Sequence, residues 1–402
     1  MRAPANGSPG LRPARAGALP EREQGGFGVS GRALGCEIRL WIRSLAEMRC
    51  GRRVHPMLLE EYRLIAMPPA RWACFVLSEE KCNGCGRCAE ACPVQLLMVD
   101  EKKARSNERY DVFRCLTCQN CTVVCPQNAV RIEGDYRVPE GFWKNADLFS
   151  GGKTGPAPLG RSRGGRFEDL EGELTETERV IYRRRSNRLY KKKQVDPGLV
   201  ERIIEAGRFA PSAGNNQPWK FIVIQNQELL QELNQQCKKT LFFFSRLCMP
   251  REWLEKKTPG DKTARLRRWQ KALLWILVRF VGGDADQRAH GGLNAVTSDP
   301  EFHTVFKAPT VILLLADKRA IGGTELDIGI CAQNMVLAAH SLGLGTCYVD
   351  LITKTIAHNR KLRQRLGIAH PFEIVTALVL GHPKGQIDGI VEREKPRIEW
   401  MR

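Results

Sequence analysis

The feature that most restricts this chain is a cysteine motif that occurs twice. Residues 82–93 read CNGCGRCAEACP and residues 115–126 read CLTCQNCTVVCP, so both runs have the form C-x2-C-x2-C-x3-C-P. Thiolates at this spacing wrap a short loop around a compact inorganic cube, and backbone amides stay free to bond its sulfurs. The proline that follows each run redirects the chain. The motif therefore predicts two 4Fe–4S clusters.

The ligands of each cluster follow from the crossed pattern of such proteins, in which the fourth cysteine of each run ligates the other cluster. We expect one cluster on Cys82, Cys85, Cys88 and Cys125, and the second on Cys92, Cys115, Cys118 and Cys121. Structural zinc sites usually combine two Cys pairs across a longer spacer. Disulfides need an oxidising compartment. Neither alternative suits two tight runs that each end in Cys-Pro.

Residues 73–134, which contain both runs, resemble bacterial-type two-cluster ferredoxins. A chain of 402 residues is long enough for two or three domains, and 43% hydrophobic and 27% charged residues are typical of soluble globular proteins. In the most hydrophobic stretch, the uninterrupted apolar run from Ala272 to Val278 has seven residues, whereas a membrane helix needs about 20. The first thirty residues lack the apolar block of a secretory signal. We therefore expect no transmembrane segment and a cytoplasmic location.

Residues 1–66 differ in composition from the rest of the chain. They contain eleven arginines, six acidic residues and no lysine, and residues 1–35 are rich in Gly, Pro and Ala. So few apolar residues cannot offset the entropy of ordering, and disorder is expected there. A second hypothesis is an over-extended start, with initiation at Met57 or Met67. A basic nucleic-acid arm or an organelle transit peptide is the third.

A linker over residues 135–174, rich in Gly, Pro, Arg and Ser, is expected to precede a second domain over residues 175–402. Thr175 and Glu178 form a capping-box pattern, so a helix should start there. Asp196 and Pro197 supply the cap and the first-turn proline of another helix.

The second half of this domain shows a longer helix and several strands. The apolar residues of 328–342 keep the helical period, with Thr324 and Asp327 as expected caps and the Gly-Leu-Gly of residues 343–345 as the end. Apolar runs predict strands over 219–224, 309–316, 346–350 and 372–381. Cys331 and Cys347 fall on these apolar elements, so we expect them to be small buried residues.

Four motifs follow one another in this region: RRSNR at 184–188, APSAGNNQPW at 210–219, DIGICAQN at 327–334 with the GLG that ends its helix, and LGHP at 380–383. In this order they resemble the FMN-dependent nitroreductase family over residues 178–402. The resemblance implies an α+β protein. Its nitroreductase-like α/β/α layered domain, the dimeric FMN fold, would be preceded by a small two-cluster ferredoxin-like domain.

The same resemblance implies which residues would hold FMN. The phosphate and ribityl chain would lie against Arg184, Arg185, Ser186 and Arg188, because guanidinium groups match phosphate in bidentate geometry. The isoalloxazine ring would be bordered by Pro211, Ser212, Ala213, Asn215 and Gln217. The backbone of Gly343, Leu344 and Gly345 would approach the flavin edge, and Arg393 and Lys395 compete as the C-terminal basic residue that reaches the phosphate. We name no catalytic acid or base.

An insertion at about residues 241–300 departs from the family pattern. Its first part, residues 241–283, alternates ten basic and three acidic residues with bulky apolar blocks. A lid or substrate-recognition role is the first hypothesis, and dimer packing is the second. An interfacial membrane helix is the third, because basic residues precede the apolar run.

A two-cluster module joined to an FMN domain predicts an iron–sulfur flavoprotein oxidoreductase. Electrons would pass through two 4Fe–4S clusters to FMN and on to a small organic acceptor of the nitroaromatic, quinone or activated-alkene type. The expected partners are a second copy of the chain, as in the family, and a low-potential electron donor protein. One alternative is an NAD(P)H-dependent nitroreductase with auxiliary clusters, and another is a non-catalytic electron-transfer subunit of a larger complex. The net charge of +19 is dispersed and no recognition module is present, so nucleic-acid binding is not expected.

Overall fold

The computed structural model describes residues 70–107, 115–139, 153–156, 167–248, 302–394 and 396–402, together with 288, 292–293 and 296–297. The expectations for residues 1–66 and for most of the 241–300 insertion lie outside the described residues, as does Lys395. Within the described part, no helix combines the length and apolar character that crossing a bilayer requires.

A four-stranded antiparallel sheet forms the centre of the second half of the chain. Its strand order is β6-β7-β9-β8, built from β6 (Trp219–Ile224), β7 (Thr310–Asp317), β9 (Phe372–Gly381) and β8 (Gly345–Tyr348). The inner strand β7 is a nearly continuous apolar run, which is the pattern of a strand that is covered on both faces. The four apolar runs of the sequence thus form one sheet.

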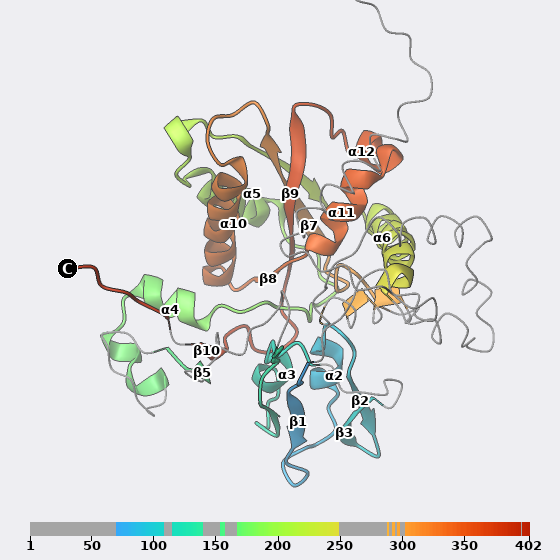
Figure 1. Ribbon diagram of the computed structural model, residues 1–402, viewed down its shortest axis with the longest axis vertical. Coiled ribbons are helices and arrows are strands. Elements are labelled where there is room, and N and C mark those ends of the chain that lie inside the picture. Colours follow the sequence, from blue (N-terminus) through green and yellow to red (C-terminus); the bar gives the residue numbers. More distant parts are fainter. Residues whose placement is uncertain are drawn as a thin grey trace, which may run out of the picture. The chain divides into compact units, whose positions relative to one another are not determined.

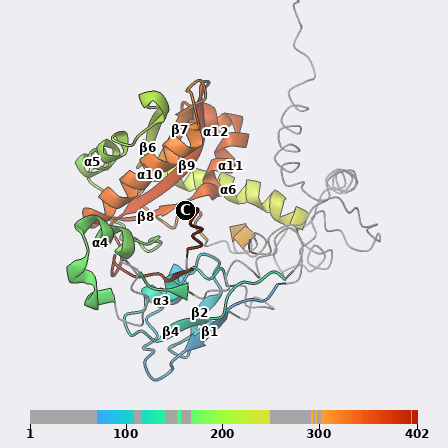
Figure 2. The ribbon, with the colours of Figure 1, turned by 60° about the vertical axis from the view of Figure 1, so that its left-hand side comes forward.

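Each face of the sheet packs against helices because alternate residues of β7 point to opposite sides. Val311, Leu313 and Leu315 join the core beneath α6 (Gln227–Cys248), α11 (Asp350–His358) and α12 (Arg360–Arg365). Ile312 and Leu314 join the core beneath α5 (Pro197–Arg208) and α10 (Thr324–Ser341). Figures 1 and 2 show the sheet between these two groups of helices. The expected α/β/α layered arrangement is confirmed.

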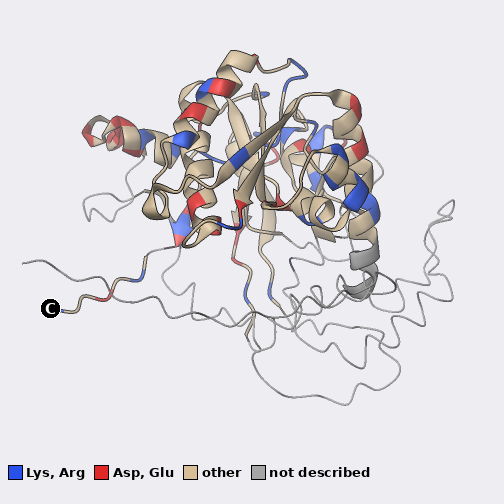
Figure 3. Ribbon diagram, turned by 90° about the horizontal axis from the view of Figure 1, so that it is seen from above, with Lys and Arg blue, Asp and Glu red and all other residues tan. Residues whose placement is uncertain are grey.

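Charged residues of both signs lie mostly on the helices and loops around this sheet, whose strands are largely uncharged (Figure 3). Several helices, such as α5, carry residues of both signs, whereas α12 carries basic residues alone.

Two of the three expected helix starts have the predicted caps. Thr175 forms a complete capping box with Glu178 before α4 (Glu176–Arg183), and Asp196 accepts a hydrogen bond from the backbone of Gly198 at the start of α5. At α10 the expectation is wrong, because the N-cap is Gly323 and no side chain caps the helix. Asp327 instead accepts a bond from the backbone N–H of Ala213 at 3.4 Å, so its carboxylate holds a neighbouring loop.

The cysteine-rich part consists of two short antiparallel ladders and two short helices. Strand β1 (Cys74–Leu77) pairs with β4 (Val130–Glu133), and β2 (Leu97–Asp100) pairs with β3 (Lys103–Ser106). Each cysteine run supplies one helix, α2 (Arg87–Ala91) or α3 (Asn120–Val123). Two small cores, centred on Ala73 and Leu97, include several of the cysteines.

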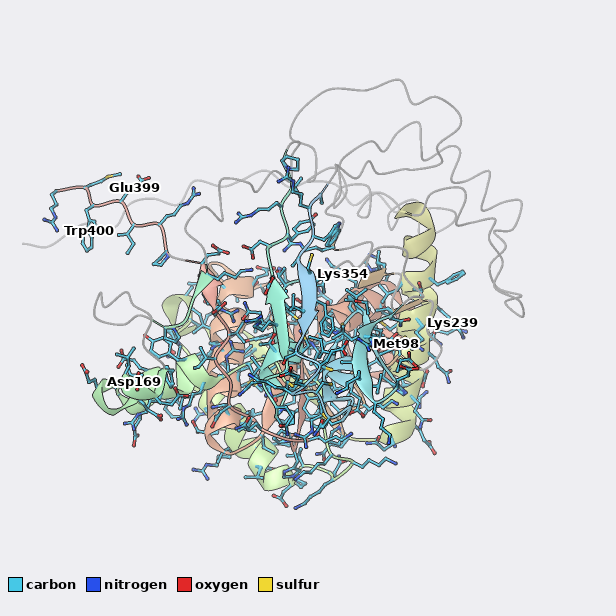
Figure 4. All side chains as sticks on the ribbon, turned by 90° about the horizontal axis from the view of Figure 1, so that it is seen from below. Met98, Asp169, Lys239, Lys354, Glu399 and Trp400 are labelled. Carbon is cyan, nitrogen blue, oxygen red and sulfur yellow. The ribbon has the colours of Figure 1, made fainter. Side chains whose placement is uncertain are left out.

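After β9 the chain continues as residues 383–394, here called the C-terminal strap. Backbone bonds tie it to the start of the second half, from Lys384 N to Leu189 O and from Gly389 N to Arg183 O. It ends in β10 (Arg393–Glu394), which pairs with β5 (Lys153–Thr154). Residues 396–402 form an extended tail that carries Glu399 and Trp400 (Figure 4). Short 3-10 turns complete the described elements: η2 (Phe167–Asp169), η3 (Glu171–Glu173) and η4 (Ala213–Asn215).

Candidate functional site

The first cysteine hollow, about 300 Å3 of space that is partly open to solvent, is lined by Cys82, Cys85, Cys88 and Cys125. These are the four side chains that the crossed pattern predicts for one cluster. Three come from the first run, where Cys88 lies on α2, and Cys125 follows α3 near the end of the second run. The fold therefore brings residues 43 positions apart, from 82 to 125, to the same hollow.

The second cysteine hollow, about 340 Å3 of space that is partly open to solvent, is lined by Cys92, Cys115, Cys118 and Cys121. The grouping is again the one predicted for a cluster. Val94, Leu96 and Ile132 supply apolar walls. The eight motif cysteines thus fall into two separate groups of four.

The spacing within each hollow bears on which metal group fits. Among the described residues, no three His, Cys, Asp or Glu side chains gather closely enough to hold a single metal ion. A zinc ion would need all its thiolates at about 2.3 Å from one atom. An iron–sulfur cube instead distributes its four thiolates over four irons. Four cysteines around a hollow of this kind therefore suit a cube better than zinc.

The backbones of the two runs bend in the same way. Left-handed residues occur at matching positions, at Gly84 and Thr117 (φ 71° and 54°) and at Gly86 and Gln119 (φ 73° and 55°). Of the four, Gly84 has the least room, because a Cβ there would overlap the carbonyl of Lys102. The repeated bends point successive thiols of each run toward one centre.

Backbone amides point at several of the thiol sulfurs. Leu96 N donates to Cys92 Sγ and Ala129 N donates to Cys125 Sγ, both at 3.3 Å and both from four residues further along the chain. Thr117 N makes a similar 3.3 Å bond to Cys115 Sγ. Hydrogen bonds to cluster sulfurs are among the factors that set a cluster's reduction potential.

Burial disfavours the thiolate form of these cysteines unless a metal compensates for it. Desolvation raises the pKa of Cys88 to about 11 and that of Cys115 to about 12. Iron ligands must be thiolates, and the positive charge of the metal deprotonates a coordinating thiol. The donor set and its burial therefore fit an iron–sulfur cluster in each hollow.

The two hollows differ in their exposure to solvent. In the first, Cys85 is exposed and Cys82 is partly exposed. In the second, Cys115 and Cys121 are buried and Cys92 and Cys118 are partly exposed. Of the eight motif cysteines, Cys85 is thus the only one that is exposed.

The RRSNR segment lies beside the end of the sheet. Ser186 forms a parallel bridge with Thr346 of β8, and Asn187 N donates to Thr346 O at 2.8 Å. A Cβ at Gly345 would lie 2.8 Å from the Cβ of Asn187, so the glycine permits this close approach. Cys347 on the same strand is 4% exposed, as expected for a small buried residue.

Arg184 and Arg393 form a small unpaired cationic group. Burial lowers the pKa of Arg184, and the nearby positive charge of Arg393 lowers it further. Among the described residues neither guanidinium forms an ion pair with a carboxylate. A partly buried guanidinium at Arg184 and an exposed one at Arg393 that repel each other are suited to bind an anion between them, and the bidentate geometry favours a phosphate.

Arg185, expected to contact the same phosphate, is directed elsewhere. It is 4% exposed, and its Nη2 donates to the carbonyl of Gln386 in the C-terminal strap at 2.7 Å. Its Nη1 approaches the side chain of Asn120 on α3 at 3.5 Å. The arginine therefore joins the second half of the chain to the helix that carries Cys121.

Asn120 is the central residue of this contact. It is 2% exposed and lies between Cys118 and Cys121 in the sequence. In the amide orientation that satisfies both of its polar atoms, it donates to the Ser186 carbonyl at 3.0 Å and accepts from Arg188 Nη1. The second cysteine run, through a residue between two of its cysteines, is thus linked directly to the RRSNR segment. Around it, Gln119 and Glu392 form two further hydrogen bonds.

The loop expected to border the flavin ring, residues 211–217, lies at the opposite end of α10. It is held there by the bond from Ala213 to Asp327, in the first turn of the helix. The RRSNR segment bridges Thr346, just beyond the last turn. The 18 residues of α10 span about 27 Å at 1.5 Å each. One chain therefore does not bring Ser212, Asn215 and Gln217 together with the arginines.

The GLG residues end α10 as the sequence predicts. Gly343 is left-handed with φ 73°, and Leu344 N bonds to Ala339 O while Gly343 N bonds to His340 O. This is the Schellman arrangement of a helix C-terminus. Its effect is to turn the chain straight into β8, where Gly345 meets the RRSNR segment.

Comparison with known proteins gives two family matches. Residues 181–382, half of the chain, match the model of the nitroreductase family, and residues 81–129 match that of a 4Fe-4S dicluster domain. The chain belongs to the nitroreductase family. The predicted fusion with a two-cluster ferredoxin module is confirmed, and the protein is an iron–sulfur oxidoreductase.

Relatives of each half are known. A protein of Archaeoglobus fulgidus named "Putative NADH dehydrogenase/NAD(P)H nitroreductase" is 25% identical over 215 residues, 54% of this chain and 90% of that protein. An uncharacterized ferredoxin of Methanocaldococcus jannaschii is 38% identical over 59 residues, 15% of this chain and 77% of that protein. A crystal structure of a nitroreductase with bound FMN from Desulfitobacterium hafniense is 23% identical, covers 57% of this chain and 100% of that chain, and has a TM-score of 0.39.

Sequence reasoning about this nitroreductase-family protein missed Asn120 and the C-terminal strap. Asn120 occupies one of the two x positions between Cys118 and Cys121, which the motif leaves open. The strap follows the LGHP motif and carries no pattern of its own. Its two glycines were the available signal, since Gly389 could not carry a Cβ without overlapping Val123 of α3.

Proposed function

We propose that this protein is an FMN-dependent oxidoreductase that takes up single electrons through two 4Fe–4S clusters and delivers them in pairs to a small organic acceptor. The observation that carries the proposal is the contact of Asn120 with Ser186 and Arg188, because it joins the second cysteine hollow to the segment expected to hold FMN. Clusters supply one-electron steps, and FMN exchanges either one electron or two.

The cysteines have distinct parts in this proposal. Cys82, Cys85, Cys88 and Cys125 hold the outer cluster, where the exposed Cys85 marks the side at which a low-potential donor docks. Cys92, Cys115, Cys118 and Cys121 hold the inner cluster, and none of these four cysteines is exposed. The exposed Cys85 therefore favours electron uptake at the outer position.

For FMN, the described residues support a phosphate position at Arg184 and Arg393. These two guanidinium groups lack a carboxylate partner within the described part of the chain, and the partial burial of Arg184 makes its uncompensated charge costly. A bound phosphate would supply the missing negative charge. Arg185 serves a different purpose, because its bond to Gln386 holds the C-terminal strap and its guanidinium lies 3.5 Å from the side chain of Asn120.

The ring of the flavin requires a second copy of the chain. Residues 211–217 lie about one helix length from the arginines, so a complete pocket forms only where another chain presents its own loop. The outer side of α10 supports such pairing, since Leu326 is 67% exposed and Ile330 is only partly covered. We therefore propose a homodimer with two shared flavin pockets.

Anaerobic stopped-flow kinetics test the electron route. With protein prepared under full iron, sulfide and FMN supply, a low-potential one-electron donor should bleach the flavin of the parent protein. Cys121→Ser, which removes an inner ligand, should slow this bleaching at least tenfold. The control Cys74→Ser changes an exposed cysteine outside both hollows and should behave like the parent.

Two outcomes would favour the alternatives. Fast bleaching by NAD(P)H alone, equal in the parent and in Cys121→Ser, would indicate an NAD(P)H-dependent nitroreductase with auxiliary clusters, as the name of the Archaeoglobus relative suggests. A stoichiometric copurifying partner, with no turnover of nitroaromatic, quinone or activated-alkene acceptors, would indicate an electron-transfer subunit. A preparation without iron or flavin would exclude the proposed function and both alternatives.

A further inference from the structure

Arg188 is expected to bind the flavin, yet its surroundings are those of a residue that faces a cluster. Its Nη1 is the group that donates to Asn120. The Nε is buried and has no hydrogen-bond partner. On another side, the guanidinium lies over the ring of Phe306, with Cζ 5.6 Å from the ring centre.

The titratable groups that influence Arg188 are three cysteine thiols and one tyrosine hydroxyl, and none of them is a carboxylate. Burial by itself lowers the pKa of Arg188, but Cys347, Cys118, Tyr190 and Cys92 outweigh that effect and raise it. Two of these four, Cys92 and Cys118, line the second hollow. Within the described part of the chain, Arg188 has no ion pair with Asp or Glu.

A buried guanidinium without a carboxylate partner is costly, because charge in the protein interior must be paired. The thiolates of the inner cluster are the available counter-charge. A 4Fe–4S cluster with four thiolates carries net negative charge and becomes more negative when reduced, so a nearby buried cation stabilises the reduced form. This raises the reduction potential of that cluster.

The cations next to the first hollow are of another kind. Lys103 Nζ donates to the carbonyl of Cys82 at 2.9 Å and to that of Glu79 at 2.5 Å, near solvent. Arg105 is paired with the carboxylate of Glu79, and both side chains are about half exposed. Exposed charges act through a high dielectric and are screened by salt. They therefore stabilise a reduced cluster less than Arg188 does.

We propose that Arg188 holds the reduction potential of the inner cluster above that of the outer cluster, so that an electron accepted at the surface moves toward the flavin domain. The inference rests on the proposed function only in requiring that both clusters are present. Arg188 acts only through its positive charge, which stabilises the reduced inner cluster. The electron moves between the clusters without any bond being formed or broken.

Redox titration followed by electron paramagnetic resonance tests this in the full-length protein loaded with clusters. The parent should show two one-electron couples, with the higher one assigned to the inner cluster by its loss in Cys121→Ser. Arg188→Gln should lower the midpoint potential of the inner cluster by at least about 59 mV, which is a tenfold change in its affinity for one electron. The outer couple should stay in place. Arg188→Lys keeps the charge and should recover most of the shift.

Lys103→Gln is the matched control, since it removes a cation beside the other hollow. It should move only the outer couple, by less than the Arg188 effect, and high salt should abolish its shift. Unchanged couples in Arg188→Gln, or equal shifts of both, would overturn the inference. The inference would also fail if the inner-cluster potential in Arg188→Lys were as low as in Arg188→Gln. If the cluster signals themselves are missing from the parent, the proposed function fails instead, and iron analysis distinguishes that case.

Discussion

At Gly84 the absence of one methyl group decides whether the first cysteine run can close around its hollow. The residue is left-handed with φ 71°, and the carbonyl of Lys102 occupies the space that a Cβ would need. Gly86, two residues on, is left-handed too, at φ 73°, but a Cβ there would meet Val99 at an ordinary 3.6 Å. A substitution at Gly86 therefore tests backbone strain alone, whereas one at Gly84 adds a steric overlap with Lys102.

We expect Gly84→Ala to lose the outer cluster and Gly86→Ala to keep it. The second change costs about 1–2 kcal/mol for a left-handed non-glycine residue, whereas the first also pushes the loop away from Lys102. Iron analysis should show about half the parent content in Gly84→Ala, with the inner signal retained. Equal iron in the two variants would contradict the steric argument.

The sequence alone was sufficient to predict the two cysteine groups, because ligand spacing is a local property of the chain. It was not sufficient for Asn120 or Asp327. The hydrogen-bond partners of a buried amide depend on the tertiary fold. Asp327 stands at a position typical of a helix cap, but its carboxylate accepts a hydrogen bond from the neighbouring loop instead. Arg185 shows the same limit, since its motif indicates a phosphate while its contacts lie at Asn120 and Gln386.

Among the elements, the C-terminal strap and α3 form the junction between the two domains. The exposed pair of Lys384 and Glu90, 2.8 Å apart, adds little, because surface ion pairs are worth about 0–1 kcal/mol. The buried contacts matter more. A Cβ at Gly389 would overlap Val123 of α3 and approach Arg185 at 3.1 Å, so the strap depends on a residue without a side chain.

Gly389→Ala should loosen this junction without removing either cluster. Overpacking of a close contact costs about 1–3 kcal/mol, and the strap can move more easily than the cysteine runs. Hydrogen exchange should increase in peptides covering residues 383–394 and α3, while iron content stays at the parent level. In the control Gly172→Ala the new methyl group meets nothing within 4 Å, and exchange should not change. Identical exchange in both variants would refute the role of Gly389.

The elements of the sheet were predictable because their apolar runs are long and uninterrupted. The sequence was sufficient to predict α10 as a helix, but not that one of its apolar sides is exposed in a single chain. It carries apolar residues on its outer side, at Leu326 and Ile330, as well as on the side that packs on the sheet. A helix that is apolar all round is usually buried on all sides, which in a single copy of this chain it is not.

For the whole molecule, the proposed pairing through α10 determines whether a flavin pocket exists at all. Leu326→Asp would place a charge in an apolar interface and should shift the protein to monomers. Sedimentation analysis should show half the parent mass, with flavin lost and iron retained. Met98 on β2, 37% exposed and far from α10 in the sequence, supplies the control Met98→Asp, which should stay dimeric (Figure 4). A dimeric Leu326→Asp that binds flavin would reject this interface.

The separation of the arginines and the 211–217 loop at the two ends of α10 has a genetic consequence. A cell that makes one copy lacking Arg184 and another lacking Asn215 would assemble mixed pairs. One pocket of each mixed pair would carry both defects, and the other would be whole. Two inactive alleles of this kind would therefore complement each other, although two alleles damaged in the same half of the pocket would not.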